Sequence, residues 1–445
     1  MSNLSKSAVF TILTQVPTQI FGIIAGIFIT RILGSEGRGL YAIFYADLAL
    51  FATILGFSIN TSIVHFSANG KLSEGKILGI SGIFSIMTIF LSLIVLAVWI
   101  NLPFAELLFP KGYDHSYFIL WFILILIINQ INSVYSSIFQ GAKKFNIVNR
   151  ISLINSLLNL SIFGVAYAFN YLGYIKIGIL EVLYIGLFVM SANFIAWHIN
   201  YVKWRKFRID YSIKWKLDIL PFFKFSGIGH LSNVINFFNY RLVLWVIAYY
   251  LDNKQIGVFS LAAGLAQLLT FISAPLSQVL MPFLSSDNEV NRIKTFGRFA
   301  RIHFTGLIII ALCGVVIAPF AIPFLYGDDF VHSARIFHIM IFGILLSCQT
   351  NLIATFFVSS NKIVLNLIAT VIGFLLTFSF NFYLVKNWNI NGAGFAQTIT
   401  YSGIFLFVYL ALIKFSNRKL INIFVITKED INYARERFIK KTGGN

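Results

Sequence analysis

Four charged side chains fall within stretches that are otherwise apolar enough to cross a membrane. Two are acids, Asp47 and Glu181, and two are bases, Lys224 and Arg241. A charge at bilayer depth costs at least about 2.5–3.5 kcal/mol on insertion scales, so each of them needs a physical reason. Glu181 comes only four residues into its span, which favours an interfacial carboxylate over a proton carrier.

Arg241 and Asp47 are expected at comparable depth. Arg241 precedes Leu251, the end of its span, by about 15 Å of helix, and Asp47 follows Gly39 by about 12 Å. Two compatible interpretations of Arg241 stay open. It is a cation that attracts phosphate in a central cavity, or it pairs with Asp47 and fixes the contact between two halves. Asp47 is therefore a candidate for ion coupling or for an inter-bundle ion pair.

Polar side chains accompany Arg241 on the same predicted helix. His230 comes eleven residues earlier, close to three helical turns, so the two share a face. Asn233 and Asn236 lie near them and extend a polar stripe. The simpler interpretation of Lys224 is that its long side chain reaches the membrane interface and places the charge there. The alternative is that Lys224 contacts an anionic head group.

The first predicted helix carries a second stripe. Gln15, Gln19, Gly22 and Gly26 follow the four-three-four spacing of one helical face. Small residues on such a face usually indicate helix packing, which is the expectation for the two glycines. The amides of Gln15 and Gln19 fit a wet cavity better. Pro17 lies between them and is a candidate bending point.

These residues belong to a chain that is membrane-embedded almost throughout. Apolar residues make up 58% and charged residues 11% of the 445 residues, and the mean hydropathy is +0.83; soluble domains carry about 25% charged residues. Stretches of about 20 mainly apolar residues can span a bilayer. Twelve such spans are predicted: 8–33, 40–66, 77–101, 116–140, 146–170, 177–200, 219–251, 256–284, 297–325, 333–359, 363–386 and 390–414.

The chain also contains an internal repeat. Residues 33–66 align without a gap on 251–284, and further on Lys143 recurs as Lys362. Six spans in each copy predict two bundles of the same orientation, related by a pseudo-two-fold axis along the membrane normal. The expected organisation is a bundle over 1–202, a basic linker over 203–218, a bundle over 219–415 and a charged tail over 416–445.

The distribution of positive charge predicts the orientation. With both termini cytoplasmic, inward segments hold seventeen Lys/Arg residues before the tail and outward loops hold seven. Topology therefore explains most of the net charge of +18, and no nucleic-acid partner is expected. The basic linker should lie on anionic lipid head groups. The tail residues 428–441 alternate charged and apolar side chains, which predicts a short amphipathic helix serving as a surface anchor or a solubilising tail.

Catalytic and cofactor motifs are not found in the sequence. The segment Gly70–Ile77 has the spacing of a phosphate-binding loop, but Ile77 replaces the Ser/Thr that would hold magnesium. No Cys/His cluster has metal-ligand spacing. We therefore predict no catalytic residue, metal or cofactor, and a transporter rather than an enzyme.

Short motifs in both halves resemble a known family. Arg31-Ile32-Leu33-Gly34, Gly37-Arg38-Gly39-Leu40-Tyr41 and the dipeptide Gly56-Phe57 resemble the opening of Wzx-type polysaccharide flippases, and Phe324–Phe330 resembles the second half of the same family. These flippases belong to the superfamily that also contains the MATE drug exporters. The resemblance covers about residues 5–415 and implies a MATE-like pair of six-helix bundles with a cavity between them.

The resemblance also implies a function. It implies alternating-access transport of an undecaprenyl-diphosphate type of lipid-linked oligosaccharide across the bacterial inner membrane, for the O-antigen of lipopolysaccharide or another surface polysaccharide. Arg241, Lys224 and His230 would then hold the diphosphate. The amides of Gln15, Gln19, Asn233 and Asn236 would contact sugars. Membrane lipids, a polysaccharide polymerase and chain-length machinery would be partners.

Two alternatives stay open. One is a MATE-like cation or drug antiporter in which Asp47 takes up the coupling ion, although MATE exporters often carry an acidic residue in the first helix and this chain has none there. The other is a membrane-bound glycan polymerase or ligase. An enzyme of that kind would need a large outward loop, and the longest one predicted here is about 101–116.

Overall fold

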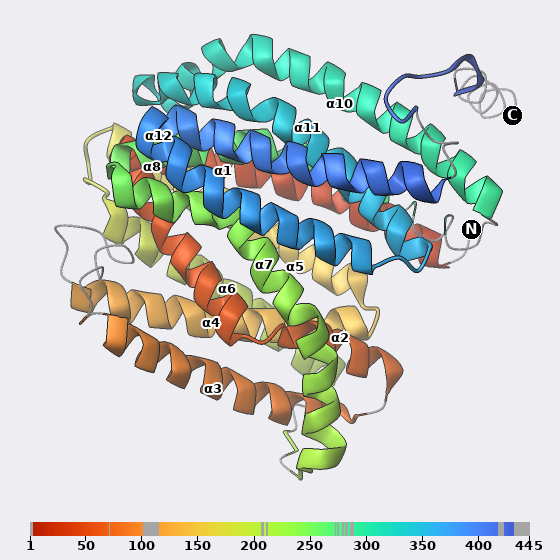
Figure 1. Ribbon diagram of the computed structural model, residues 1–445. Coiled ribbons are helices and arrows are strands. Elements are labelled where there is room, and N and C mark those ends of the chain that lie inside the picture. Colours follow the sequence, from red (N-terminus) through yellow and green to blue (C-terminus); the bar gives the residue numbers. More distant parts are fainter. Residues whose placement is uncertain are drawn as a thin grey trace, which may run out of the picture. The chain divides into compact units, whose positions relative to one another are not determined.

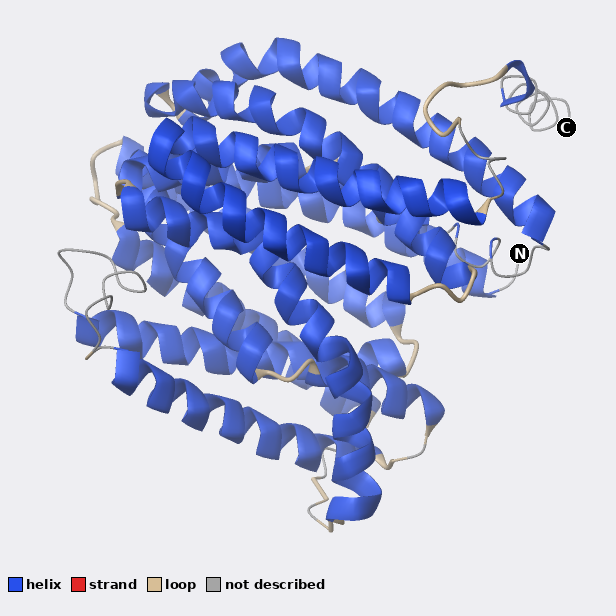
Figure 2. Ribbon diagram, viewed as in Figure 1, coloured by secondary structure: helices blue, strands red, loops and turns tan. Residues whose placement is uncertain are grey.

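The computed structural model describes residues 3–70, 72–99, 101, 115–205, 209–210, 212–271, 273, 276–277, 280, 284, 289–416 and 422–430. Within these residues the regular secondary structure is helical, with no strand (Figures 1 and 2). Nine of the described helices are long and apolar enough to cross a membrane. The predicted all-α polytopic membrane fold is therefore confirmed.

Most helices begin and end within a few residues of the predicted spans, because the apolar runs set their lengths. They are α1 (Asn3–Leu55), α2 (Ile59–Asn69), α3 (Glu74–Trp99), α4 (His115–Gly141), α5 (Phe145–Tyr171), α6 (Ile179–Trp204), the π-helix η2 (Trp215–Ile219), α7 (Leu220–Tyr250), α8 (Asn253–Gln267), α10 (Glu289–Tyr326), the 3₁₀-helix η3 (Asp328–Phe330), α11 (Val331–Ser359) and α12 (Val364–Phe415).

Two of these helices each contain more than one predicted span. α1 breaks at Gly34, whose φ of 62° lies in the left-handed region that favours glycine. α12 breaks at Trp388 and Asn389. The predicted span 256–284 begins as α8, and much of its remainder lies outside the described residues. The count of twelve spans therefore stays a prediction.

The chain forms two compact units. Unit 1 comprises residues 1–237 and 251–257, and unit 2 comprises 238–250 and 258–445. The division falls inside α7, so the first part of this helix packs with unit 1 and the rest with unit 2. The sequence-based boundaries, with a linker at 203–218, stay predictions.

Aromatic side chains fill the interior of unit 1. Phe139, Tyr201 and Phe222 are at most 1% exposed and belong to one cluster that joins α2–α6 and the start of α7. Lipid tails are as apolar as these side chains, so close van der Waals packing rather than exclusion of water holds such helices together. In unit 2 the corresponding cluster includes Phe296 and Phe357, from α10 and α11.

The internal repeat is visible as a reciprocal contact within unit 1. A Cβ added at Gly39 would lie 1.8 Å from the carbonyl oxygen of Asn253, and one added at Gly257 would lie 1.9 Å from that of Ser35. Gly39 and Gly257 occupy matching positions in the repeat, as do Ser35 and Asn253. The matched segments therefore meet with two-fold reciprocity, and only glycine permits the two backbones to approach so closely.

A second trace of the repeat lies where α4 and α11 end. The Lys144 amide donates to the carbonyl of Phe139 in the first half, and the Lys362 amide donates to that of Phe357 in the second. This turn satisfies carbonyls that a helix end leaves free. By this turn, Lys144 is the position in the first half that is equivalent to Lys362 in the second. The match of Lys362 to Lys143 in the sequence is therefore wrong by one residue.

Residues of the linker and the tail also pack on the helices. Lys76 and Asp218 form an ion pair of 2.9 Å, and the Asp210 amide donates to the carbonyl of Gly75. In the tail, Ile423 is fully buried and Asp430 is 1% exposed. The start of the tail is thus docked on unit 2. Neither a surface anchor nor a solubilising tail predicts this docking. Residues 431–445 lie outside the described part.

Asp430 holds the tail through arginines of α10. Arg301 donates from Nε and Nη2 to its two carboxylate oxygens, at 2.6 and 2.9 Å, and Arg298 lies 3.4 Å away. The hydrogen bond from Arg301 is the main reason why the pKa of the Asp430 carboxyl lies well below its usual range.

Gly39→Ala is expected to lower the free energy of unfolding by about 1–3 kcal/mol, because two backbones must separate to admit the methyl group. Gly257→Ala should have the same effect through the reciprocal contact. Gly22→Ala is the control, since a Cβ there meets nothing within 4 Å. Thermal unfolding of the detergent-solubilised protein measures all three, and an unchanged melting temperature for Gly39→Ala would contradict the close approach.

Acidic pH is expected to release the tail segment 422–430. Because the folded-state pKa of Asp430 is depressed, its stabilising contribution is present above the unfolded value of about 4 and is lost as pH falls through the folded-state pKa. Asp430→Asn should weaken docking at neutral pH by about 1–3 kcal/mol, less than for a fully buried pair because the arginines keep some water. Hydrogen exchange of the 422–430 amides measures both effects. Glu429→Gln, at an exposed neighbour, should leave exchange unchanged.

Candidate functional site

The helical path of unit 1 is interrupted between α1 and α2, inside a stretch predicted to span the membrane. Phe57 and Ser58 adopt left-handed conformations, with φ of 47° and 51°. Gly56 permits this turn, because a Cβ there would lie 2.2 Å from the Ala52 carbonyl oxygen. Non-helical backbone at membrane depth is tolerated only where protein buries it or where it lines a hydrated cavity.

Neighbouring helices satisfy the main-chain groups that this interruption frees. Thr88 of α3 donates to the Leu55 carbonyl at 3.0 Å, and His230 of α7 lies near the Ile54 carbonyl. Ser62 of α2 donates to the Phe222 carbonyl of α7 at 2.7 Å. The interruption therefore brings α7 against α2 and positions the α7 polar stripe.

Ser58 is the centre of a small polar cluster. Its Oγ accepts a hydrogen bond from Asn233 Nδ2 at 3.0 Å and is hydrogen-bonded to His230 Nδ1 at 3.3 Å. The His230 ring stacks on Phe57, with centroids 5.1 Å apart. The structure thus brings together two of the sequence-predicted residues, His230 and Asn233. They meet through Ser58 and Phe57, to which the sequence analysis gave no role in the site. We call Ser58, His230 and Asn233 the polar cluster.

The other predicted α7 residues of unit 1 flank this cluster. Lys224 is exposed, about 9 Å along the helix from His230. Among the described residues it makes no ion pair, so its ammonium group is available to an anion. Asn236 is half-buried and Asn233 is exposed. Together they provide a neutral amide surface beside one cation.

Arg241 lies in unit 2, where it has tyrosines as neighbours. Its side chain is exposed and lies within electrostatic range of Tyr401 of α12. Tyr401 is 3% exposed, and its hydroxyl has no hydrogen-bond partner within the described residues. The ring of Tyr240 packs against that of Tyr401 at 6.0 Å. An exposed guanidinium, with its planar fork of donors, is suited to a phosphate oxygen.

Asp47 is 2% exposed within unit 1. Its expected ion pair with Arg241 would join the two units and stays a prediction, as does its role in coupling. Glu181 accepts a hydrogen bond from the Gly178 amide at the start of α6. It therefore caps a helix end, as expected of an interfacial carboxylate.

The α1 stripe carries the two remaining predicted amides. Gln15 is exposed and Gln19 is half-buried, and neither makes a hydrogen bond to another described residue. Their contact with sugars stays a prediction. The expected packing of Gly22 and Gly26 is not seen, since a Cβ at either position would meet nothing within 4 Å. α1 continues as a helix through Pro17.

Metal binding finds no support in the described part of the chain, which contains no group of three or more His, Cys, Asp or Glu residues able to hold an ion. The expectation that no cofactor is needed stays a prediction.

The chain is similar in structure to membrane flippases and transporters. Lipid II flippase MurJ in an inward closed conformation matches with a TM-score of 0.69 and 15% identity, covering 91% of this chain and 87% of that one. An inward-facing multidrug resistance MATE family transporter matches at 0.67 and 14%, covering 90% and 96%. A MOP superfamily transporter from Pyrococcus furiosus matches at 0.56 and 16%, covering 92% and 94%. These likenesses confirm the expected MATE-like fold.

No curated protein sequence matches the chain. A family model described as polysaccharide biosynthesis protein matches residues 4–287, more than half of the chain. That match includes α1–α7 and therefore the interruption at Gly56, the polar cluster and Arg241. The chain belongs to the polysaccharide biosynthesis protein family, and its fold is that of membrane flippases and transporters rather than of an enzyme.

Proposed function

We propose that this protein is a flippase that carries an undecaprenyl-diphosphate type of lipid-linked saccharide across the bacterial cytoplasmic membrane, for O-antigen or another surface polysaccharide. The observation that carries the proposal is the polar cluster at the interruption between α1 and α2, in a chain of the polysaccharide biosynthesis family. Interrupted membrane helices commonly supply the substrate sites of transporters.

The physical problem of such a substrate explains these features. Its lipid tail stays in the bilayer, because burial of each CH₂ is worth about 0.8 kcal/mol. Its sugars and diphosphate cannot cross hydrocarbon unaided, because each unsatisfied polar group costs several kcal/mol. A protein that presents amides, hydroxyls and a few cations at membrane depth replaces the lost water.

The proposal divides the head group between two kinds of side chain. Arg241, whose side chain is exposed, supplies charge-assisted hydrogen bonds to the diphosphate. Lys224 and His230 assist. The amides contact sugar hydroxyls, each offering both donors and an acceptor. They are Gln15, Gln19, Asn233 and Asn236.

The proposed setting follows from the charge distribution. Both termini and the basic linker lie on the cytoplasmic side, where the lipid-linked substrate would be made. A polymerase and chain-length machinery would receive the saccharide on the other side. Asp47 is proposed either to pair with Arg241 or to bind a coupling proton or sodium ion during alternating access.

Removal of the amide from the polar cluster should impair export. We expect Asn233→Leu to reduce surface polysaccharide at least fivefold in a deletion strain of the source bacterium, with lipid-linked intermediates accumulating in the inner leaflet. Asn387→Leu is the control, because Asn387 is also exposed and bonds only its own helix, at the Tyr383 carbonyl. Normal glycan in the deletion strain, with altered drug sensitivity, would refute the flippase and favour an antiporter that uses Asp47.

Loss of the cation at position 241 should weaken substrate binding about 10- to 100-fold, the equivalent of one charged hydrogen bond. Arg241→Ala should therefore reduce surface polysaccharide strongly, and Arg241→Lys should restore part of it because the charge remains. Lys386→Ala, at an exposed cation of α12, should have no effect. Wild-type glycan levels with Arg241→Ala at normal expression would exclude Arg241 as the diphosphate ligand.

A further inference from the structure

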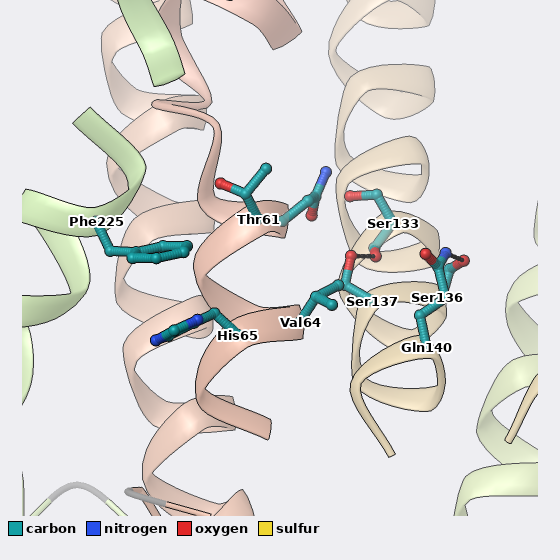
Figure 3. Close-up of a pocket in the computed structure, with 9 residues that line it drawn as sticks. Thr61, Val64, His65, Ser133, Ser136, Ser137, Gln140 and Phe225 are labelled. Atoms are coloured by element: carbon teal, nitrogen blue, oxygen red, sulfur yellow. Dashed lines mark hydrogen bonds between the residues drawn. The ribbon is translucent and has the colours of Figure 1, made fainter. Parts of the chain in front are cut away.

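Unit 1 contains a pocket of about 660 Å³ that none of the roles above uses. It lies between α2, α4 and the first turns of α7 (Figure 3). Its volume falls within the range of about 300–1,000 Å³ that is usual for small-molecule sites. The pocket adjoins the polar cluster, because Thr61 on its wall donates to the carbonyl of Ser58 at 2.7 Å.

The α4 wall of the pocket is a row of hydrogen-bond acceptors. Ser133, Ser136, Ser137 and Gln140 follow three-one-three spacing and share one helical face. Ser133 and Ser137 donate to carbonyls one turn earlier, at 2.7 Å each. The Gln140 Nε2 group donates to Ser136 Oγ at 3.0 Å. Since these donors bond within the helix, the oxygen lone pairs are left for a ligand that donates hydrogen bonds.

The opposite side of the pocket offers a flat apolar surface. The ring of Phe225 stacks on that of His65, with centroids 3.9 Å apart and planes inclined by 22° (Figure 3). Phe225 is 40% exposed, so this surface is accessible. The exposed amide of Asn60 lies on the same wall as His65 and adds both a donor and acceptors.

Charge is absent from the residues that line this pocket, none of which is Asp, Glu, Lys or Arg. A diphosphate would therefore be desolvated without a counter-charge, and so would an organic cation. The ligand that fits is neutral, donates several hydrogen bonds and has an apolar face. A sugar ring, with hydroxyls around its edge and C–H groups on its face, has this chemistry.

We propose that this pocket binds an uncharged sugar unit of the saccharide. Its hydroxyls donate to the α4 oxygens, and its ring lies against Phe225 and His65. The proposal rests on the proposed function and adds a sugar-binding subsite distinct from the diphosphate ligands. It assigns recognition of one neutral sugar unit to α2, α4 and the start of α7, in addition to the amides named above, and it implies that a neutral sugar strengthens binding of the lipid.

The test compares lipids with and without a sugar. The purified protein in nanodiscs is titrated with undecaprenyl diphosphate and with the same lipid carrying glucose, galactose or N-acetylglucosamine, and binding is measured by native mass spectrometry. We expect at least one glycolipid to bind wild type about tenfold more tightly than the bare lipid. Ser136→Ala/Gln140→Ala and, separately, Phe225→Leu should reduce this preference to less than threefold while leaving binding of the bare lipid unchanged.

Controls separate the subsite from the proposed function and from misfolding. Ser161→Ala removes a serine bonded to its own helix in the same way on α5, outside the pocket, and should retain the preference. Arg241→Ala should weaken binding of all these lipids alike. If wild type binds the lipids without any sugar preference, or if the pocket variants keep that preference, the subsite is refuted and the flippase stands. If wild type binds none of them, the proposed function itself fails.

Discussion

Inside a membrane every main-chain amide and carbonyl must find its partner within the protein, and this requirement governs the site. Where Phe57 and Ser58 leave the helical conformation, carbonyls at the end of α1 lose their intrahelical partners. Thr88 of α3 supplies a replacement at the Leu55 carbonyl, and His230 of α7 lies near the Ile54 carbonyl. His230 also belongs to the polar cluster, so the same side chain lies against the interrupted backbone and within the cluster.

The second constraint is how closely two backbones can approach. At Gly39 and Gly257 the matched segments of the repeat meet with no room for a side chain. The contact is reciprocal. Gly39 faces the carbonyl of Asn253, and Gly257 faces the carbonyl of Ser35, which is the residue that matches Asn253 in the repeat. A duplicated segment that packs against its own copy requires the same small residue twice, which explains why glycine occurs at both positions.

Unit 1 separates charged from uncharged binding chemistry along α7. Lys224 and Phe225 are adjacent in sequence, yet Phe225 lines a pocket without charged residues while Lys224 remains exposed and unpaired among the described residues. Neutral hydroxyls whose protons are bound within their own helix accept hydrogen bonds without the desolvation cost of an ion. In the proposed function, the diphosphate and the sugars of one head group present both demands at once.

The amino-acid sequence alone determined the class of fold, because apolar runs long enough to span a bilayer have few alternatives to the membrane helix. It also determined the repeat and the polar stripe of His230 and Asn233, since residue spacing fixes the face of a helix. Helical spacing also places Ser133, Ser136, Ser137 and Gln140 on one face, so the sequence contains the signal for this polar face of α4 as well.

The tertiary structure decided which stripes meet. Only packing showed that Ser58 joins His230 and Asn233, that Tyr401 lies near Arg241, and that Gly22 and Gly26 face open space. It also showed the first tail residues docked through Asp430. Contacts between residues more than a hundred positions apart depend on how helices pack in three dimensions, and helical periodicity contains no information about which neighbour a face will meet.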